Sequence, residues 1–165
     1  MSKKMKKAKS FLVKYGLLIS MACGVLVLVM AFVNAVVLDS EYIESAYTGF
    51  QVAFGKKLDD NGFAKIDFSI LAVLAYLLPV IVAAVSCFVI KNRQLGGLIT
   101  AVVFLLAAIL LFIMPSITSV TAEVFGKATT TSLKDSDYVL AIGAILGGIF
   151  ASLGCLSAAG AVVSK

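Results

Sequence analysis

Long uncharged runs separated by short charged segments dominate the chain. The first run, 15–38, has 24 residues without a charge, and as an α-helix it would reach about 36 Å at 1.5 Å per residue. The hydrocarbon core of a bilayer is about 30 Å thick. Three further uncharged runs follow at 68–90, 95–114 and 138–163. Because each is longer than a typical buried helix of a soluble protein, the pattern predicts four transmembrane spans.

The predicted fold class is an all-α integral membrane protein: a four-transmembrane-helix bundle with a small extracytoplasmic β-hairpin or sheet in the first external loop. The predicted segments are, in chain order, a basic cytoplasmic N-terminus (1–14), the first span (15–38), an external loop (39–67), the second span (68–90), a cytoplasmic loop (91–94), the third span (95–114), a second external loop (115–137), the fourth span (138–163) and a cytoplasmic C-terminus (164–165).

The first external loop carries a different pattern. Apolar residues alternate with small or polar ones over 49–54 and again over 63–68, which is typical of half-buried strands. The Asn61-Gly62 pair between them suits a tight turn with positive φ. We therefore predict a β-hairpin, with a further strand from the β-branched stretch 117–124. An isolated hairpin is marginal in water, so this sheet is expected to pack on the outer helix ends.

Composition favours the bilayer as the main solvent. Hydrophobic residues make up 61% of the chain and charged residues 14%, more apolar surface than a soluble domain of this size is able to bury. A soluble enzyme domain, a disordered polymer and a disulfide-stapled secreted module are excluded. The chain has no histidine, and no span contains Asp, Glu, Lys or Arg. We therefore expect no enzymatic activity, no cofactor and no metal.

The distribution of charge predicts the orientation. Segments 1–14, 91–94 and 164–165 carry nine basic side chains and no acidic one, whereas the external loops carry all nine acidic residues with five lysines. The sides thus hold +9 and −4, and the positive-inside rule places both termini in the cytoplasm, with the plasma membrane as the expected location. No nucleic-acid partner is needed to explain the basic excess. The N-terminal lysines are expected to contact anionic inner-leaflet lipid: Lys3, Lys4, Lys6, Lys7 and Lys9.

A cleaved signal peptide is the alternative for the first span. Val33-Asn34-Ala35 is a loosely acceptable cleavage site after a basic start. The 24-residue run, however, is longer than a signal h-region of about 7–15 residues. The favoured interpretation is a span that the protein retains.

Small residues recur along the fourth span. Rows of this kind let helix backbones approach closely, which is the main attraction available between helices in lipid. This ridge either closes the four-helix bundle itself or binds another subunit. Its members are Gly143, Gly147, Ala151, Gly154 and Ala158.

Aromatic residues gather near the outer boundary of the predicted membrane region. They either anchor the chain at the interface or form an external docking surface or a lipid groove. The candidate docking residues are Tyr47, Phe50, Phe54 and Phe63.

Four spans, cytoplasmic termini and a β-structured first loop resemble the plan of claudin-type tetraspan proteins. The resemblance is topological only, since the chain has no Trp and no cysteine in its loops. The expected function is a non-enzymatic accessory, scaffold or interaction subunit, with the bilayer and a membrane protein or a second copy as partners. The alternative is a transport or channel component whose pathway forms by oligomerisation, lined by Asn34, Ser86 and Thr100. A membrane enzyme is a less favoured third class.

Overall fold

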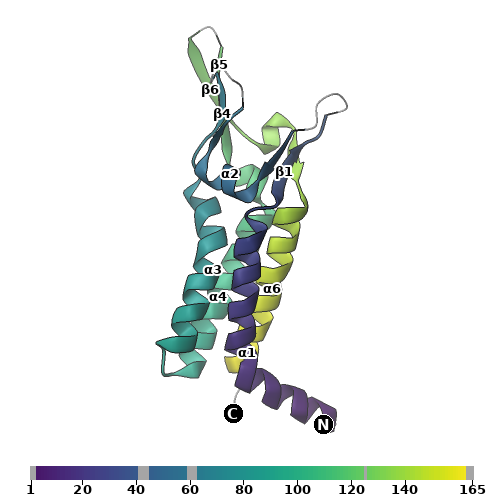
Figure 1. Ribbon diagram of the computed structural model, residues 1–165, viewed down its shortest axis with the longest axis vertical. Coiled ribbons are helices and arrows are strands. Elements are labelled where there is room, and N and C mark those ends of the chain that lie inside the picture. Colours follow the sequence, from purple (N-terminus) through teal and green to yellow (C-terminus); the bar gives the residue numbers. More distant parts are fainter. Residues whose placement is uncertain (1–2, 41–44, 59–62, 125, 163–165) are drawn as a thin grey trace.

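A computed structural model describes residues 3–40, 45–58, 63–124 and 126–162. Long helices run side by side, and strands from both long connections form a cap at one end of them (Figure 1). The fold is 64% helical with two small sheets. These sheets make its class mixed α/β rather than all-α.

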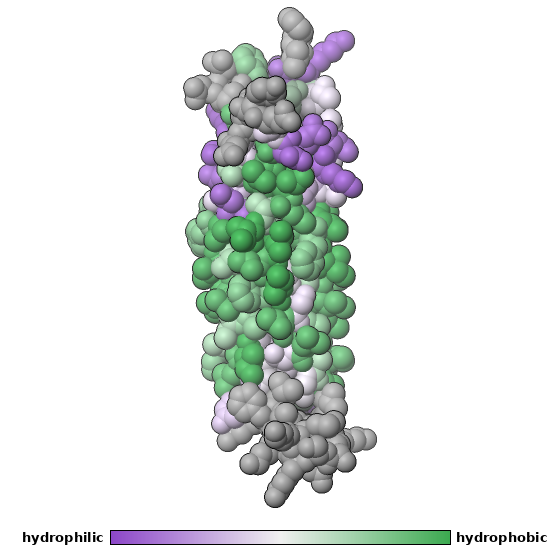
Figure 2. Space-filling view, turned by 90° about the vertical axis from the view of Figure 1, so that its right-hand side faces the viewer, coloured by the Kyte–Doolittle hydropathy of each residue, from purple (hydrophilic) through white to green (hydrophobic). Residues whose placement is uncertain are grey.

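The described residues form four long helices, of which three have the length and composition to cross a membrane. The apolar part of the remaining helix, Tyr15–Met30, is shorter. On the face that Figure 2 shows, a broad hydrophobic band covers the helices, and hydrophilic residues gather at the cap. These features are those of a multi-pass membrane protein. The four helices are α1 (Lys3–Met30), and the three candidate spans α3 (Ile70–Phe88), α4 (Arg93–Phe112) and α6 (Ile142–Val162).

The outer ends of the first and fourth predicted spans are strands, which corrects the expectation of helix there. After α1 ends, the chain forms β1 (Asn34–Leu38), and β7 (Tyr138–Leu140) precedes α6. Val36, Val37 and Tyr138 are of the β-branched and aromatic types that favour strands. An uncharged run alone does not distinguish a helix from a buried strand.

The first sheet directly continues two of the helices. Its strand order is β2 (Ala46–Thr48), β1, β7, and both pairings are antiparallel. Because β1 follows α1 and β7 precedes α6, the ladder from Val36↔Leu140 to Leu38↔Tyr138 joins the cap ends of these two helices.

The second sheet combines both long connections. Its β3–β4 pair is a short hairpin in the first connection, and the Asn61-Gly62 turn expected there lies outside the described residues. The strand predicted within 117–124 is confirmed as β5. The antiparallel order is β3 (Lys56–Lys57), β4 (Ala64–Ile66), β5 (Ser119–Val124) and β6 (Lys127–Ser132).

Residues 49–54, expected to be a strand of the hairpin, form a helix instead, α2 (Gly49–Phe54). Thr48 and Gln51 make a capping box at its start. The Thr48 hydroxyl accepts from the Gln51 amide at 3.3 Å, and the Gln51 side chain accepts from the Thr48 amide at 3.2 Å. The buried residues follow helical rather than alternating spacing: Gly49, Val52 and Ala53.

Two short helical elements complete the cap, α5 (Met114–Ile117) and the 3₁₀ helix η1 (Lys134–Ser136). Pro115 lies in the first turn of α5. Because proline has no amide hydrogen, it helps to end α4 just before this position.

The four long helices form a closed ring in the order α1, α6, α4, α3. Neighbours in this ring run antiparallel (Figure 1). The end of the ring opposite the cap holds Lys91 and Arg93 and the start of α1, and we call it the basic end. The molecule thus has two chemically different ends joined by an apolar bundle.

Candidate functional site

The small-residue ridge of α6 lies inside the helix ring. All five of its residues are buried. A Cβ at Gly154 would collide with the ring of Phe104 on α4, and one at Gly147 would lie 3.3 Å from Leu111 on the same helix. Internal packing therefore accounts for this ridge without a partner subunit.

Two hydroxyl contacts reinforce the ring. Ser20 Oγ on α1 lies 2.9 Å from the carbonyl oxygens of both Gly16 and Gly154, so its proton links α1 to α6. Thr100 Oγ1 donates to Ser86 Oγ at 2.8 Å and links α4 to α3. These bonded hydroxyls are buried, whereas Asn34 is exposed at the cap. The three groups considered for a pathway thus do not lie together.

The sequence-predicted docking residues divide into two groups in the structure. Tyr47 is buried, with its ring centroid 5.9 Å from that of Tyr138, and the Lys56 ammonium lies 5.2 Å above the Tyr47 ring. Burial, with a further contribution from Tyr47, raises the pKa of Tyr138 to about 12. Tyr47 therefore belongs to the interior of the cap and not to an outer surface.

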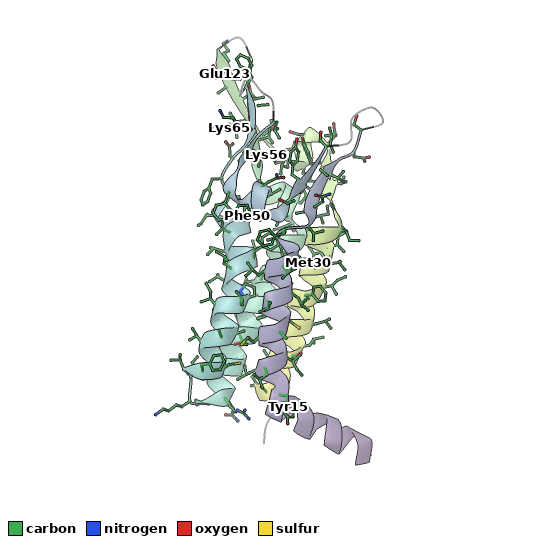
Figure 3. The ribbon with its side chains drawn as sticks, in the orientation of Figure 1. Tyr15, Met30, Phe50, Lys56, Lys65 and Glu123 are labelled. Carbon is green, nitrogen blue, oxygen red and sulfur yellow. The ribbon has the colours of Figure 1, made fainter. Side chains whose placement is uncertain are left out.

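Phe50 and Phe54 are half-exposed, and they form part of a longer row of rings. Phe50 stacks on Phe32 with centroids 5.9 Å apart, Phe54 lies 4.5 Å from Phe50, and Phe68 lies 6.3 Å from Phe54. Phe50 lies where the cap meets the helices (Figure 3). This aromatic row suits the membrane interface. Phe63 is also exposed.

A small apolar crevice of about 110 Å³ lies beside the aromatic row, between α1, α2 and α3. Leu28, Val73 and Leu77 contribute to its wall. The nearby Tyr76 hydroxyl faces Met114 Sδ at 3.9 Å. A space of this size and chemistry fits a few methylene groups of a lipid chain and no polar ligand.

The β5–β6 hairpin projects beyond the rest of the cap (Figure 1), and Glu123 lies near its tip (Figure 3). Residues 127–131 of β6 are exposed. Glu123 donates its amide to Phe63 O at 2.6 Å, and Ser119 O accepts from the Asp67 amide at 2.9 Å. These residues of β5 therefore direct their backbone groups toward the first connection and away from β6.

The register then fixes which backbone groups of β6 point outward. Glu123 pairs with Ala128, and Thr121 pairs with Thr130. Since backbone groups in an antiparallel ladder alternate in direction, Ala128 and Thr130 direct theirs to the free edge. Within the described part of the chain, no strand pairs with that edge. An open edge of this kind is a template for another extended segment.

Hydroxyl groups line an open depression of about 470 Å³ at the base of the hairpin. Ser132 Oγ donates to Asp135 Oδ2 at 2.7 Å, and Thr131 and Ser136 hydroxyls lie 3.0 Å apart. Thr118 Oγ1 is buried and has no hydrogen-bond partner in the structure. The sequence pattern did not single out these hydroxyls, because Thr118 is separated along the chain from those of β6 and η1.

The described residues contain no group of three or more His, Cys, Asp or Glu side chains placed to hold a metal ion. Cys23, Cys87 and Cys155 are free thiols on three different helices. The side chains of the five candidate lipid-contact lysines in 3–9 lie outside the described part, although their backbone belongs to α1 at the basic end.

Replacement of Gly154 by leucine should destabilise the bundle by about 1–3 kcal/mol, because the new side chain has no room beside Phe104. The measurement is the unfolding midpoint of the detergent-solubilised monomer in increasing sodium dodecyl sulfate. Leu156→Ala, on the exposed side of α6, is the control and should change little. Phe104→Ala should partly restore the Gly154→Leu midpoint, and an unchanged midpoint in Gly154→Leu alone would refute the internal contact.

Tyr138 should lose its proton near pH 12 in the folded protein, against about 10 for an exposed tyrosine. The pKa of Tyr138 is higher in the folded than in the unfolded protein. Its protonated phenol therefore contributes fully to the free energy of unfolding below about pH 10, and this contribution is lost as the pH rises toward 12. The difference in absorbance at 295 nm between wild type and Tyr138→Phe, recorded against pH, measures this midpoint. A midpoint near 10 would contradict the buried placement.

The features on the two ends differ in kind: an aromatic row and an open strand edge at the cap, and basic side chains opposite. No family model matches the chain, and comparisons with curated proteins and with solved structures give no match.

Proposed function

We propose that this chain is a non-enzymatic polytopic membrane protein that serves as an accessory or scaffold subunit, and that it binds a protein partner through the projecting β5–β6 hairpin. The observation that carries the proposal is the free edge of β6, exposed beyond the cap and uncovered by any other described strand. The partner contributes an extended segment that adds to this edge through main-chain hydrogen bonds.

The proposed topology has four spans in the plasma membrane, with the basic end and both termini in the cytoplasm. Three helices have the length and composition of spans, and α1 completes their ring between α6 and α3. The turn at the cap end of α1, which contains Ala31, Phe32 and Val33, adds apolar residues to that helix. Lys91 and Arg93 at the basic end favour the cytoplasmic side, and the aromatic row supports an interface at the other end.

The filled bundle favours binding over transport. Small residues bring the helices into contact, and the hydroxyls of Ser86 and Thr100 bond each other. No Asp, Glu, Lys or His occurs within α3, α4 or α6, and the one Arg is Arg93 at the start of α4. The chemistry that could select a partner is therefore concentrated in the cap.

A cysteine at the hairpin should label from outside intact cells, and one at the basic end should not. Thr129→Cys and Gln94→Cys, each in a chain with its native cysteines replaced by alanine, are the matched pair. A membrane-impermeant maleimide should label the Thr129→Cys variant on intact cells, and the Gln94→Cys variant only after the cells are permeabilised. The reverse pattern would overturn the proposed orientation and leave the fold untouched.

Thr130→Pro should weaken partner recovery by roughly three- to tenfold, the equivalent of about one lost hydrogen bond. Proline removes the outward amide of β6 while the amides that face β5 remain. Thr130→Ala keeps that amide and is the matched control. Cross-linking in native membranes, affinity purification and quantitative mass spectrometry measure recovery. Equal recovery of the same partner with both variants would refute edge binding, as would the reproducible absence of any partner.

A further inference from the structure

The helix ring is not equally tight along its length on the side of α1 and α3. In the middle of the bundle, Gly24 of α1 lies against the α3 backbone, where an added Cβ would be 2.9 Å from Val80 Cα. Toward the basic end, α1 turns its small residues to α6 instead: a Cβ at Gly16 would lie 2.5 Å from Ser157 O, and Ser20 bonds Gly154 O. The α1 helix thus contacts α6 both here and near the cap, at Met30 beside Gly147, whereas Gly24 places its close contact with α3 in the middle of the bundle.

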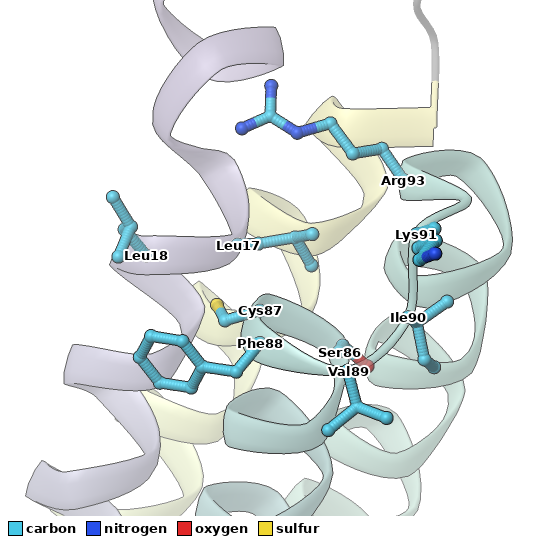
Figure 4. A pocket seen from close by; sticks show the side chains of 9 residues that line it. All are labelled: Leu17, Leu18, Ser86, Cys87, Phe88, Val89, Ile90, Lys91 and Arg93. Atoms are coloured by element: carbon cyan, nitrogen blue, oxygen red, sulfur yellow. The ribbon is translucent and has the colours of Figure 1, made fainter.

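A wedge-shaped pocket of about 370 Å³ opens between α1 and α3 at the basic end as a result. This volume lies within the roughly 300–1,000 Å³ of typical ligand sites. Leu17 and Cys87 face the space between the helices (Figure 4). Leu18, Phe88 and Val89 line the pocket with exposed fractions of 50%, 76% and 69%. Its apolar part is therefore open sideways, toward the position that lipid chains occupy around an inserted bundle.

The mouth of the same pocket is cationic. Lys91 and Arg93 both line it, and Arg93 extends from the start of α4 toward α1 (Figure 4). The sequence contains no Asp or Glu between Asp67 and Glu123, so α3, α4 and their connection carry basic side chains and no acidic one. Apolar walls under a positively charged mouth are complementary to an amphiphile with an anionic head.

We propose that this wedge binds one anionic phospholipid of the leaflet around the basic end, with the phosphate beside Lys91 and Arg93 and an acyl chain between α1 and α3. Asn92 Oδ1 already accepts from the amides of Gln94 and Leu95 in the first turn of α4, at 3.1 and 3.3 Å. The phosphate therefore relies on the two side chains and not on the helix start. This site requires insertion of the bundle, which is part of the proposed function, and is independent of any partner at the cap.

Native mass spectrometry of the full chain in detergent, titrated with dioleoylphosphatidylglycerol or dioleoylphosphatidylcholine, tests the site. The anionic lipid should bind with a stoichiometry of one and at least roughly tenfold more tightly than the zwitterionic lipid, because each basic side chain contributes to the attraction. The double variant Lys91→Gln with Arg93→Gln should lose that preference. Lys127→Gln with Lys134→Gln removes the same charge at the cap and should keep it.

Cys87 gives a second readout that needs no substitution. Bound phosphatidylglycerol should slow its alkylation by N-ethylmaleimide several-fold, measured by peptide mass spectrometry, while Cys155 on α6 reacts at an unchanged rate. Ten millimolar inorganic phosphate should leave Cys87 as reactive as before. Equal protection by inorganic phosphate, equal binding of the two lipids, or an unchanged preference in the Lys91 and Arg93 variant would each overturn the lipid site. These outcomes bear on the wedge alone and leave the hairpin proposal intact.

Discussion

Close backbone approach along α6 is the constraint on which the rest of the structure depends. Within lipid, helices gain little from the hydrophobic effect, so they associate through van der Waals contact and short polar bonds. Gly154 leaves space for the Phe104 ring, and a Cβ at Gly97 of α4 would already lie 3.0 Å from Ala158 O. Ser20 adds a hydroxyl bond to the carbonyl of the same Gly154. One row of small residues thus lets α6 pack closely against both α1 and α4.

The arrangement of the cap follows from this packing of α6. Since α1 and α6 lie side by side, β1 and β7 leave and enter them close enough to form an antiparallel ladder. Backbone groups that leave a helix need new partners, and the paired strands supply them. The second sheet is anchored to this base through α2 and the α5 turn and extends farther from the bundle. The β5–β6 hairpin consequently combines a fixed base with a free edge.

Sequence patterns identify the apolar helices and strand β5, because length and β-branched content are local properties. They fail at Asn34–Leu38 and Tyr138–Leu140, where an uncharged run conceals a change from helix to strand. They also fail at 49–54, where the same apolar residues fit a strand or a helix and the capping box at Thr48 favours the helix. Phe32 joins the aromatic row, and Cys87 the wedge, only through contacts between distant segments. No local pattern encodes such contacts.

The joint between α1 and α6 has a mechanical consequence. Two contacts join these helices far apart along their length, the Ser20 hydrogen bond toward the basic end and the β1–β7 ladder at the cap, so sliding or rotating one helix against the other would break at least one of them. The same α1 helix lies against the α3 backbone at Gly24. The α6 helix is also packed against α4, where Gly154 leaves space for the Phe104 ring. The position of α1 is therefore set through α6, so the pocket beside Leu17 has one wall that is fixed by contacts on the opposite side of the helix.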